Sequence, residues 1–205
     1  STLINLIPRF YDVSEGSIRI DGIDVRKFNL KALRKKIGFI RQKNLLFTGT
    51  IKSNIKFGKP HATHDEVENS AKIAQAYDFI TTKEKGFDEP ISEGGSNVSG
   101  GQKQRLSIAR ALVRKSEIYI FDDSFSALDF KTDAKLRKAI NEELSDSTLL
   151  IVAQRISTIM NADQILVLDE GKVVGKGTHK ELMENCEVYR QIALSQLSKE
   201  ELQDE

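Results

Sequence analysis

Two acidic residues end a short apolar run near the middle of the chain. The run Ile118-Tyr119-Ile120-Phe121 is followed directly by Asp122 and Asp123. The pattern is typical of a buried strand that leaves the core. It also suits a metal site, because a carboxylate at the carboxyl edge of a parallel sheet can hold hydrated Mg²⁺ beside phosphates. An apolar run followed by Asp is common, so the pattern alone leaves both interpretations open.

A second candidate site is the segment Ser99-Gly100-Gly101-Gln102, which directly precedes a helical pattern that continues to Val113. Ser99 with Gln102 three residues later is a capping box, which needs no ligand. The two glycines would also let phosphate oxygens approach the backbone. A helix N-terminus presents free amides and the positive end of its dipole to such an anion. The two roles are compatible with one another.

The elements that would position these residues are indicated by short apolar runs bounded by turn residues. These runs predict strands at 17–20, 36–40, 117–121, 148–153 and 164–168. The last three lack polar alternation, and we expect them to be parallel strands covered on both faces. The glycine turn in 20–23 predicts a small antiparallel hairpin at the edge of the sheet. Between Phe47 and Val113 the pattern is mainly helical, so the sequence predicts an α/β core with a helical subdomain.

The composition restricts the classes of partner. The chain has 31 Lys and Arg residues against 30 Asp and Glu residues, so its net charge of +1 gives no global attraction to nucleic acid or anionic lipid. A local basic stretch could meet phosphates, although charge runs are usually solvated faces; it consists of Arg26, Lys27, Lys31, Arg34, Lys35 and Lys36. No apolar run approaches the roughly 20 residues of a membrane-spanning helix. The single cysteine, Cys186, excludes an internal disulfide.

In these two segments the chain resembles the ATP-binding domain of ABC transporters. Val98-Ser99-Gly100-Gly101-Gln102 resembles the signature loop, and the run that ends at Asp122 resembles the Walker B strand, a short helix and strand later. Three further motifs are present, and all five stand in the order that the family has along the chain. Gln42 resembles the Q-loop, Ser126-Ala127-Leu128-Asp129 the D-loop and Ala153-Gln154-Arg155 the switch region.

The amino-acid sequence between the motifs resembles the exporter branch of the family, notably at residues 8–12, 46–51 and 167–182. The resemblance implies one ABC ATP-binding domain over 1–205, with an α/β, P-loop NTPase-type parallel-sheet core, a helical signature subdomain and the remnant of an antiparallel β subdomain. The core would comprise 1–44 and 115–205, and the helical subdomain 45–114. Ser1-Thr2 resembles the end of Walker A, which implies that its glycine loop, its lysine and at least one strand precede Ser1.

The resemblance also implies ATP and Mg²⁺ as ligands. The residues implied to bind the nucleotide are Ser1, Thr2, Gln42, Ser99, Gly100, Gly101, Gln102, Asp122 and Asp129, and those at the magnesium are Ser1, Gln42 and Asp122. Asp123, Gln154 and Gln42 would be catalytic. The implied function is an ATPase subunit that powers export at the cytoplasmic face of the cell membrane, with a second ABC ATP-binding domain and a transmembrane domain as partners. The segment 1–205 by itself is expected to bind Mg-ATP weakly and to be inactive, because the Walker A cradle is not in it.

Two positions depart from the family pattern at the chemical step. Asp123 stands where most members have glutamate, and its carboxylate is withdrawn by about 1.5 Å. Gln154 stands where the family usually has histidine, and an amide cannot carry a proton. Together the two changes resemble the degenerate half of a heterodimeric exporter. Val98 replaces the usual leucine of the signature, and Pro90 replaces a glutamate common before it.

Two other functions are compatible with these residues. One is a regulatory nucleotide-binding module without catalysis, which the substitutions at Asp123 and Gln154 favour. The other is a soluble ABC ATPase that acts on DNA, which the basic stretch favours. Such relatives typically carry a long coiled coil between Q-loop and signature, and residues 42–99 lack sustained heptads. The sequence therefore favours the exporter, without a nucleic-acid partner.

Overall fold

The computed structural model describes residues 1–196, which belong to two compact units, Ser1–Val152 and Ala153–Glu205. The helices and strands of the first unit are α1 (Thr2–Asn5), β1 (Arg19–Ile20), β2 (Ile23–Asp24), α2 (Leu30–Lys35), β3 (Ile37–Ile40), β4 (Gly49–Thr50), α3 (Ile51–Lys56), α4 (His64–Ile73), α5 (Tyr77–Thr81), β5 (Pro90–Ile91), α6 (Gly100–Leu112), β6 (Ile118–Asp122), α7 (Phe130–Glu143) and β7 (Thr148–Val152), with short 3-10 turns at Val25–Lys27, Gly86–Asp88 and Glu93–Gly95. The second unit contains α8 (Ile156–Ile159), β8 (Ile165–Asp169), β9 (Lys172–Gly177), α9 (His179–Asn185) and α10 (Glu187–Gln196).

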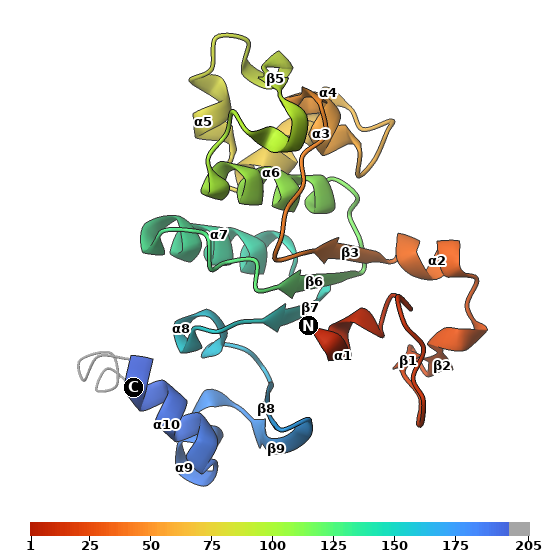
Figure 1. Cartoon of the computed structure of the whole chain (residues 1–205), viewed down its shortest axis with the longest axis vertical. Helices are drawn as coiled ribbons and strands as arrows, with labels where there is room; N and C mark the ends of the chain where they lie inside the picture. Colours follow the sequence, from red (N-terminus) through yellow and green to blue (C-terminus); the bar gives the residue numbers. More distant parts are fainter. Residues whose placement is uncertain (197–205) are drawn as a thin grey trace. The chain divides into compact units, whose positions relative to one another are not determined.

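The central sheet of the first unit is parallel, with strand order β3-β6-β7. Helices α6 and α7 lie along one side of this sheet (Figure 1). Parallel strands need long crossovers, and here the helical stretch between β3 and β6 and helix α7 between β6 and β7 provide them. The predicted α/β core is therefore confirmed.

Strand β6 is buried on both faces because its side chains alternate between two apolar clusters. Tyr119 and Phe121 pack with residues of α6 and α7, including Leu106 and Leu136. Ile120 points to the other cluster, which includes residues of α1 and α2. Tyr119, Ile120 and Phe121 are all fully buried, and each contributes about 1.5–3 kcal/mol of hydrophobic stabilisation. This packing fixes the carboxyl end of the strand, where the two acidic residues lie.

The stretch predicted to be helical contains α3 to α6. Val67, Ala71 and Ala74 are fully buried, as their helical spacing predicts, and Phe79 is partly buried against the same cluster. A short antiparallel pair between β4 and β5 lies among these helices. The predicted helical character is confirmed, while the subdomain boundaries at 44 and 115 stay a prediction.

The expectation of parallel pairing was wrong for β8. This strand pairs with β9 in an antiparallel two-stranded sheet of the second unit. The turn between them places Glu170 and Gly171 at positive φ, which reverses the chain at once and leaves no room for a crossover. Leu166 and Leu168 are exposed, so β8 is covered on one face only. Strand β7 is also less covered than expected, because the residues from Leu149 to Val152 are only half-buried.

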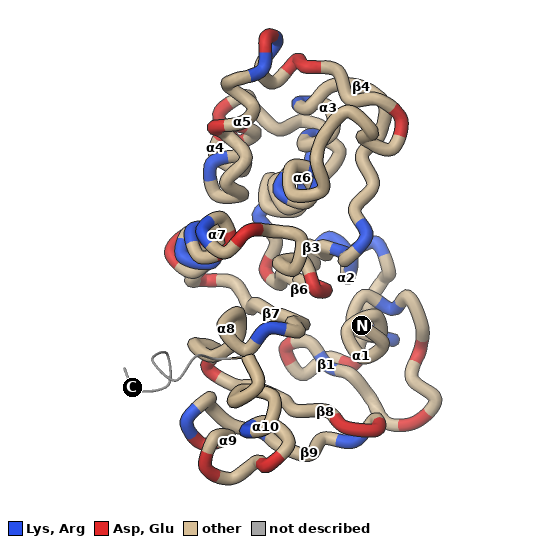
Figure 2. Tube along the Cα trace, turned by 60° about the vertical axis from the view of Figure 1, so that its left-hand side comes forward, with Lys and Arg blue, Asp and Glu red and all other residues tan. Residues whose placement is uncertain are grey.

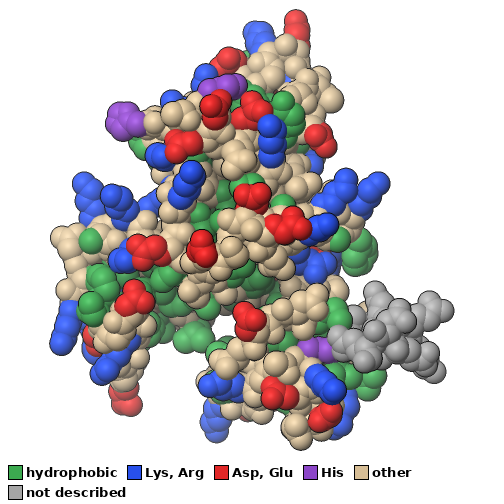
Figure 3. Space-filling model, turned by 180° about the vertical axis from the view of Figure 1, so that it is seen from behind, with side chains coloured by type: hydrophobic (Ala, Val, Ile, Leu, Met, Phe, Trp, Pro, Cys, Tyr) green, Lys and Arg blue, Asp and Glu red, His purple; other side chains and the backbone are tan. Residues whose placement is uncertain are grey.

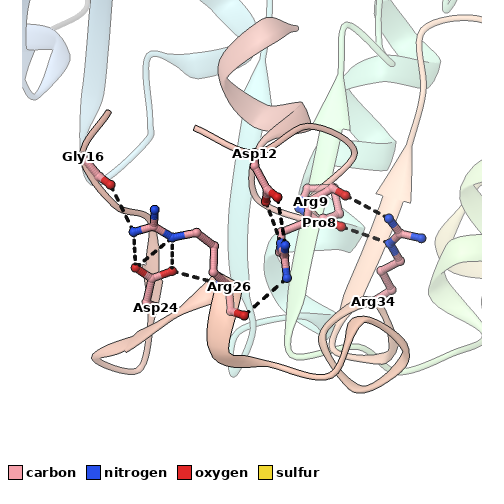
Figure 4. Close-up of polar contacts among 7 residues, drawn as sticks. All are labelled: Pro8, Arg9, Asp12, Gly16, Asp24, Arg26 and Arg34. Carbon is pink, nitrogen blue, oxygen red and sulfur yellow. Dashed lines mark hydrogen bonds and ion pairs between the residues drawn. The ribbon is translucent and has the colours of Figure 1, made fainter. Parts of the chain in front are cut away.

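The predicted hairpin at 20–23 is confirmed. Asp21 and Gly22 both have positive φ, as a two-residue turn between antiparallel strands requires. The hairpin forms a small sheet of its own instead of extending the central one. Arg26 follows it, and its guanidinium donates to the Asp24 carboxylate and to the Gly16 carbonyl (Figure 4).

Two further arginines fasten the loop after α1. Arg9 donates to both carboxylate oxygens of Asp12, and Arg34 of α2 donates to the carbonyls of Pro8 and Arg9 (Figure 4). The hydrogen bond from Arg9 lowers the pKa of Asp12, as the hydrogen bond from Arg26 does for Asp24. Because both pKa values are depressed, these contacts stabilise the fold above roughly pH 4 and are lost as the pH falls below that range.

Gly58 allows the closest approach between α3 and α6. A Cβ at this position would lie 1.9 Å from the carbonyl oxygen of Arg110, which is backbone and cannot turn away. We expect Gly58→Ala to lower the melting temperature by roughly 3–10 °C, because overpacking forces the backbone to shift. Gly100→Ala is the matched control, since a Cβ there meets nothing within 4 Å. Equal melting temperatures for the two variants would contradict this account of the packing.

Candidate functional site

Polar side chains meet at the carboxyl edge of the central sheet. Asp122 ends β6 and Asp123 follows it, while Gln42 comes two residues after the end of β3. The hydroxyl of Ser1 donates to Asp122 Oδ1 at 2.7 Å, and Gln42 Nε2 donates to Asp123 Oδ2 at 2.8 Å. The carboxyl ends of β3 and β6 meet at one edge, and the bond from Ser1 adds the start of the chain, so residues from three distant segments form one cluster. The predicted grouping of Ser1, Gln42 and the two acids is therefore present.

The two acidic residues are buried, and the backbone of the second one is constrained. Asp122 and Asp123 are each 8% exposed, and Asp123 adopts a left-handed conformation with φ 48°. The Asp123 amide donates to the carbonyl of Val152 at 2.9 Å. A non-glycine residue in this region of φ is uncommon and costs free energy that the surroundings must offset. The strand ends therefore fix the direction of the Asp123 side chain.

Ser124 is a positioning residue that the sequence analysis did not single out. Its side chain is fully buried and its hydroxyl donates to the carbonyl of Ile40 at 3.0 Å and lies 3.3 Å from that of Asp122. The hydroxyl thus ties the end of β3 to the end of β6. A serine directly after two acids at a strand end was the available indication.

The donor set at this edge fits magnesium. Ser1 supplies a hydroxyl, Asp122 a carboxylate, and Gln42 keeps its amide oxygen available because its Nε2 is the atom bonded to Asp123. Mg²⁺ prefers such oxygen ligands and is usually held by one or two carboxylates together with substrate phosphates and water. The described part of the chain has no group of three His, Cys, Asp or Glu residues that could hold a metal ion. A magnesium held by these residues would take its further ligands from phosphate oxygens and water.

The signature segment forms a separate, exposed site at the start of α6. Ser99 is the N-cap of this helix, and the capping box predicted with Gln102 is confirmed by hydrogen bonds in both directions, at 3.3 Å and 3.1 Å. The Ser99 oxygen accepts in this box, so its hydroxyl hydrogen remains available to an anion. Ser99 and Gly100 are exposed at the surface. The capping box occupies the Gln102 amide, while the amides of Gly100 and Gly101 have no acceptor within the helix, which makes this end suitable for a phosphate.

The D-loop segment lies beside the signature segment. A Cβ built on Gly101 would stand 3.5 Å from the carbonyl oxygen of Ala127. Asp129 caps α7 by accepting from the Thr132 amide at 2.9 Å, and this hydrogen bond lowers the pKa of Asp129. The carboxylate therefore stays charged at neutral pH and serves its own helix. The nucleotide contact predicted for Asp129 stays a prediction.

Thr2 and Gln154 complete the predicted site residues. Thr2 is exposed at the first position of α1, next to Ser1. Gln154 lies in the second unit, where its carbonyl accepts a hydrogen bond from Gln196 Nε2 at 2.9 Å. The Gln196 side chain also accepts from the Ile156 amide at 2.9 Å. The roles of Thr2 in nucleotide binding and of Gln154 in catalysis stay predictions.

A network around the segment after Gln42 was not expected from the sequence. Asn54 of α3 is 1% exposed and bonds both the amide and the carbonyl of Phe47. Arg110 of α6 donates to the carbonyls of Leu45 and Asn54, and burial lowers its pKa. An asparagine at a core position of a predicted helix was the available indication. The network fastens the segment after Gln42 to two helices.

The parallel sheet, its edge of oxygen donors and the capped glycine helix define an α/β nucleotide-binding domain. Residues 1–126, more than half of the chain, match the ABC transporter family. The chain is 48% identical over 200 residues to an uncharacterized ABC transporter ATP-binding protein of Bacillus subtilis, covering 98% of this chain and 35% of that protein. It is 47% identical over 192 residues to a putative multidrug export ATP-binding/permease protein of Staphylococcus aureus, covering 94% of this chain and 33% of that protein.

A solved structure agrees with these sequence relatives. The structure of a bacterial Atm1-family ABC exporter with ATP bound superposes with a TM-score of 0.93 at 38% identity, covering 97% of this chain and 35% of that one. The chain therefore belongs to the ABC transporter family. It spans about a third of the length of the curated relatives it matches. Within residues 1–196, none of the helices combines the length and the apolar character that crossing a bilayer requires.

The hydrogen bond from the Ser1 hydroxyl to Asp122 suggests a test of the magnesium site predicted at these two residues. Asp122→Asn keeps the shape of the side chain and removes its charge. We expect the Mg²⁺ concentration that supports half-maximal nucleotide binding to rise about 10- to 100-fold in the transporter that contains this domain. Asp123→Asn is the control and should change this concentration less, because Asp123 bonds Gln42 rather than Ser1. An unchanged magnesium requirement in Asp122→Asn would show that the metal lies elsewhere.

Proposed function

We propose that this chain is the ATP-binding part of a membrane exporter subunit, which closes on a second ABC ATP-binding domain when ATP is bound. The observation that carries the proposal is that the first unit has two separate groups of residues suited to bind phosphate. One is the buried cluster of Ser1, Gln42, Asp122 and Asp123 at the sheet edge. The other is the exposed helix end at Ser99.

Two such groups suit a nucleotide that is shared between domains. Mg-ATP would bind at the sheet edge, where Ser1, Gln42 and Asp122 hold the metal and its phosphates. Ser99, the amides of Gly100 and Gly101 and the dipole of α6 would stabilise the γ-phosphate of ATP in the neighbouring domain. These donors face solvent in the single chain, so their binding energy is released only when the two domains close. ATP binding would therefore drive dimerisation, and hydrolysis would reverse it.

The residues at the chemical step support a slow site in this chain. Asp123 bonds Gln42, and its carboxylate is withdrawn by about 1.5 Å relative to the glutamate of the family pattern. Displacement of a general base by roughly 1 Å can cost about a hundredfold in rate. Gln154 can donate a hydrogen bond to a phosphate but cannot carry a proton. The signature, which departs from the family pattern at Val98 alone, would then serve a faster site in a different partner, which makes the assembly a heterodimer.

The asymmetric arrangement is tested by comparing two alanine variants of the assembled transporter. Ser99→Ala should lower phosphate release by about tenfold or more, because it removes a donor from the fast site. Asp123→Ala should change it less than twofold, because the site it disables is already slow. Asp123→Glu is the companion variant and should raise turnover at this chain's own site. Equal losses from Ser99→Ala and Asp123→Ala would contradict the asymmetry.

A groove in the first unit suits the membrane-spanning partner. It has a volume of about 380 Å³ and is lined by residues of β3, the segment after Gln42, the two residues that follow α3, and α6. Its apolar lining includes Leu45, Phe47 and Phe57, which are 69%, 47% and 64% exposed. Exposed apolar side chains of this size, grouped and bordered by Arg41 and Arg114, are typical of a protein interface. We assign this groove to a segment of the transmembrane domain.

Loss of the groove contact should separate transport from ATP turnover. In the intact transporter, Phe57→Ala should lower substrate transport at least fivefold while ATP turnover falls less than twofold, since the change removes an interface side chain and leaves the sheet edge intact. Ile23→Ala, which truncates an exposed apolar residue of the hairpin, is the control and should affect neither. Parallel loss of transport and turnover in Phe57→Ala would count against this docking surface.

The alternative functions are less well supported by the contacts. Three of the six basic residues that favoured a DNA-linked ATPase make internal contacts, with Arg26 on Asp24, Arg34 on two carbonyls and Lys36 on Glu117. Figure 2 shows Lys and Arg positions along the trace of α2, and on the face seen from behind the basic and acidic side chains are interspersed (Figure 3). A regulatory module without catalysis differs from the proposal in one measurable respect, because Asp123→Glu would then leave its own site inactive.

A further inference from the structure

The side chain of Gln196, at the end of α10, holds the backbone of the segment that contains Gln154. Its Nε2 donates to the carbonyl of Gln154 at 2.9 Å, and its Oε1 accepts from the amide of Ile156 at 2.9 Å. Arg155 between them is extended, with φ −99° and ψ 128°. In an extended chain the carbonyl before a residue and the amide after it point to the same side. One side-chain amide therefore pairs with this segment as a neighbouring strand would.

Helix α8 uses this contact because it has no side-chain cap of its own. Arg155 occupies the N-cap position and makes no capping hydrogen bond. The first amides of a helix have no acceptor within it, and an N-cap Ser, Thr, Asp or Asn usually supplies one. At α8 the acceptor for the amide of Ile156 comes instead from Gln196, which is 40 residues later. The contact therefore fixes the start of α8 together with the segment before it.

The position of Gln196 is set by the buried face of α10. Tyr189 and Ala193 are 2% and 0% exposed, and they pack in the same apolar cluster as Ile156 of α8. Gln196 continues this series at the spacing i, i+4 and i+7, which places it on the same face of the helix. A polar residue thus ends an apolar stripe where α10 meets α8. The packing of α10 therefore carries the amide of Gln196 to the start of α8.

We propose that Gln196 is a positioning residue for the nucleotide site, and that its amide orients the Gln154 backbone so that the Gln154 side chain donates to the γ-phosphate of ATP. The inference rests on the proposed function and deepens it, because it names the group that directs Gln154. The Gln154 side chain is exposed, so its direction depends on the backbone more than on packing. Loss of the bond from Gln196 would let the Gln154 carbonyl turn toward water. Because ADP has no γ-phosphate, the loss would weaken the binding of ATP and spare that of ADP.

The test measures the preference of this chain's own site for ATP over ADP in the intact transporter. Photolabelling of this chain on ice with a photoreactive ATP analogue, in competition with ATP or ADP, gives both affinities and separates its site from the partner's. Gln196→Ala and Gln196→Glu should each lower the ratio of ATP affinity to ADP affinity roughly three- to tenfold, the scale of one hydrogen bond. Gln196→Glu keeps an acceptor for the Ile156 amide and places a second oxygen against the Gln154 carbonyl, so it isolates that contact. A merely structural loosening would weaken ATP and ADP alike.

Gln191 provides the matched control, because it belongs to the same helix and its side chain donates to Glu187 within that helix. Gln191→Ala and Gln191→Glu should leave the ratio unchanged. Gln154→Ala keeps the carbonyl and removes the side-chain donor, so it should lower the ratio at least as much as Gln196→Ala. The double variant of Gln154→Ala with Gln196→Ala should be no worse than Gln154→Ala alone, because Gln196 acts through Gln154.

The outcomes separate the inference from the proposed function. An equal fall in the Gln191 variants, equal weakening of ATP and ADP in the Gln196 variants, or additive losses in the double variant would overturn the inference. If Gln154→Ala lowers the ratio and both Gln196 variants keep the wild-type value, only the inference fails. If Gln154→Ala leaves the ratio unchanged, the role of Gln154 in the proposed function fails, and the inference fails with it.

Discussion

The burial of β6 between two apolar layers is the constraint on which the rest of the structure depends. Tyr119 and Phe121 face one layer and Ile120 the other, so the strand cannot slide or turn without exposing a large side chain. The strand therefore presents Asp122 and Asp123 at a fixed place on the sheet edge. Ser1 and Gln42 reach that place through one side-chain hydrogen bond each, while Ser124 bonds the carbonyls of Ile40 and Asp122.

Helix α6, which Ser99 caps, is held in place differently from the residues at the sheet edge. The middle of α6 is buried deeply, with Leu106, Ile108 and Ala109 fully covered, while Ser99 and Gly100 at its N-terminus are exposed. A helix anchored by its middle and open at its N-terminus keeps its free amides and its dipole available to an external anion. The same helix also binds the segment after Gln42 through Gln104 and Arg110. One element thus connects the exposed Ser99 segment with the segment that follows Gln42 of the oxygen cluster.

Several contacts position segments of the chain relative to one another and contribute little to the free energy of unfolding. Arg34 of α2, the helix that leads into β3, donates to the carbonyls of Pro8 and Arg9 in the loop after α1, and Arg9 bonds Asp12 within that loop. These arginine contacts are largely exposed, and such pairs contribute little free energy each. Their geometric effect is larger, because they relate the start of α1 to the strand before Gln42. The positive φ of Asp123 is a further constraint of this kind, held by the strand ends on either side.

The sequence by itself determined the motifs, their order and the local structure around them. The capping box at Ser99, the turn at Asp21 and Gly22 and the buried run before Asp122 depend on neighbours within a few residues, so the pattern sufficed. Only the tertiary structure decided the pairing of β8 and the contacts of Asn44, Gln104 and Ser124. A strand's partner and a side chain's distant acceptor depend on packing over many residues, and apolar composition alone does not distinguish parallel from antiparallel pairing.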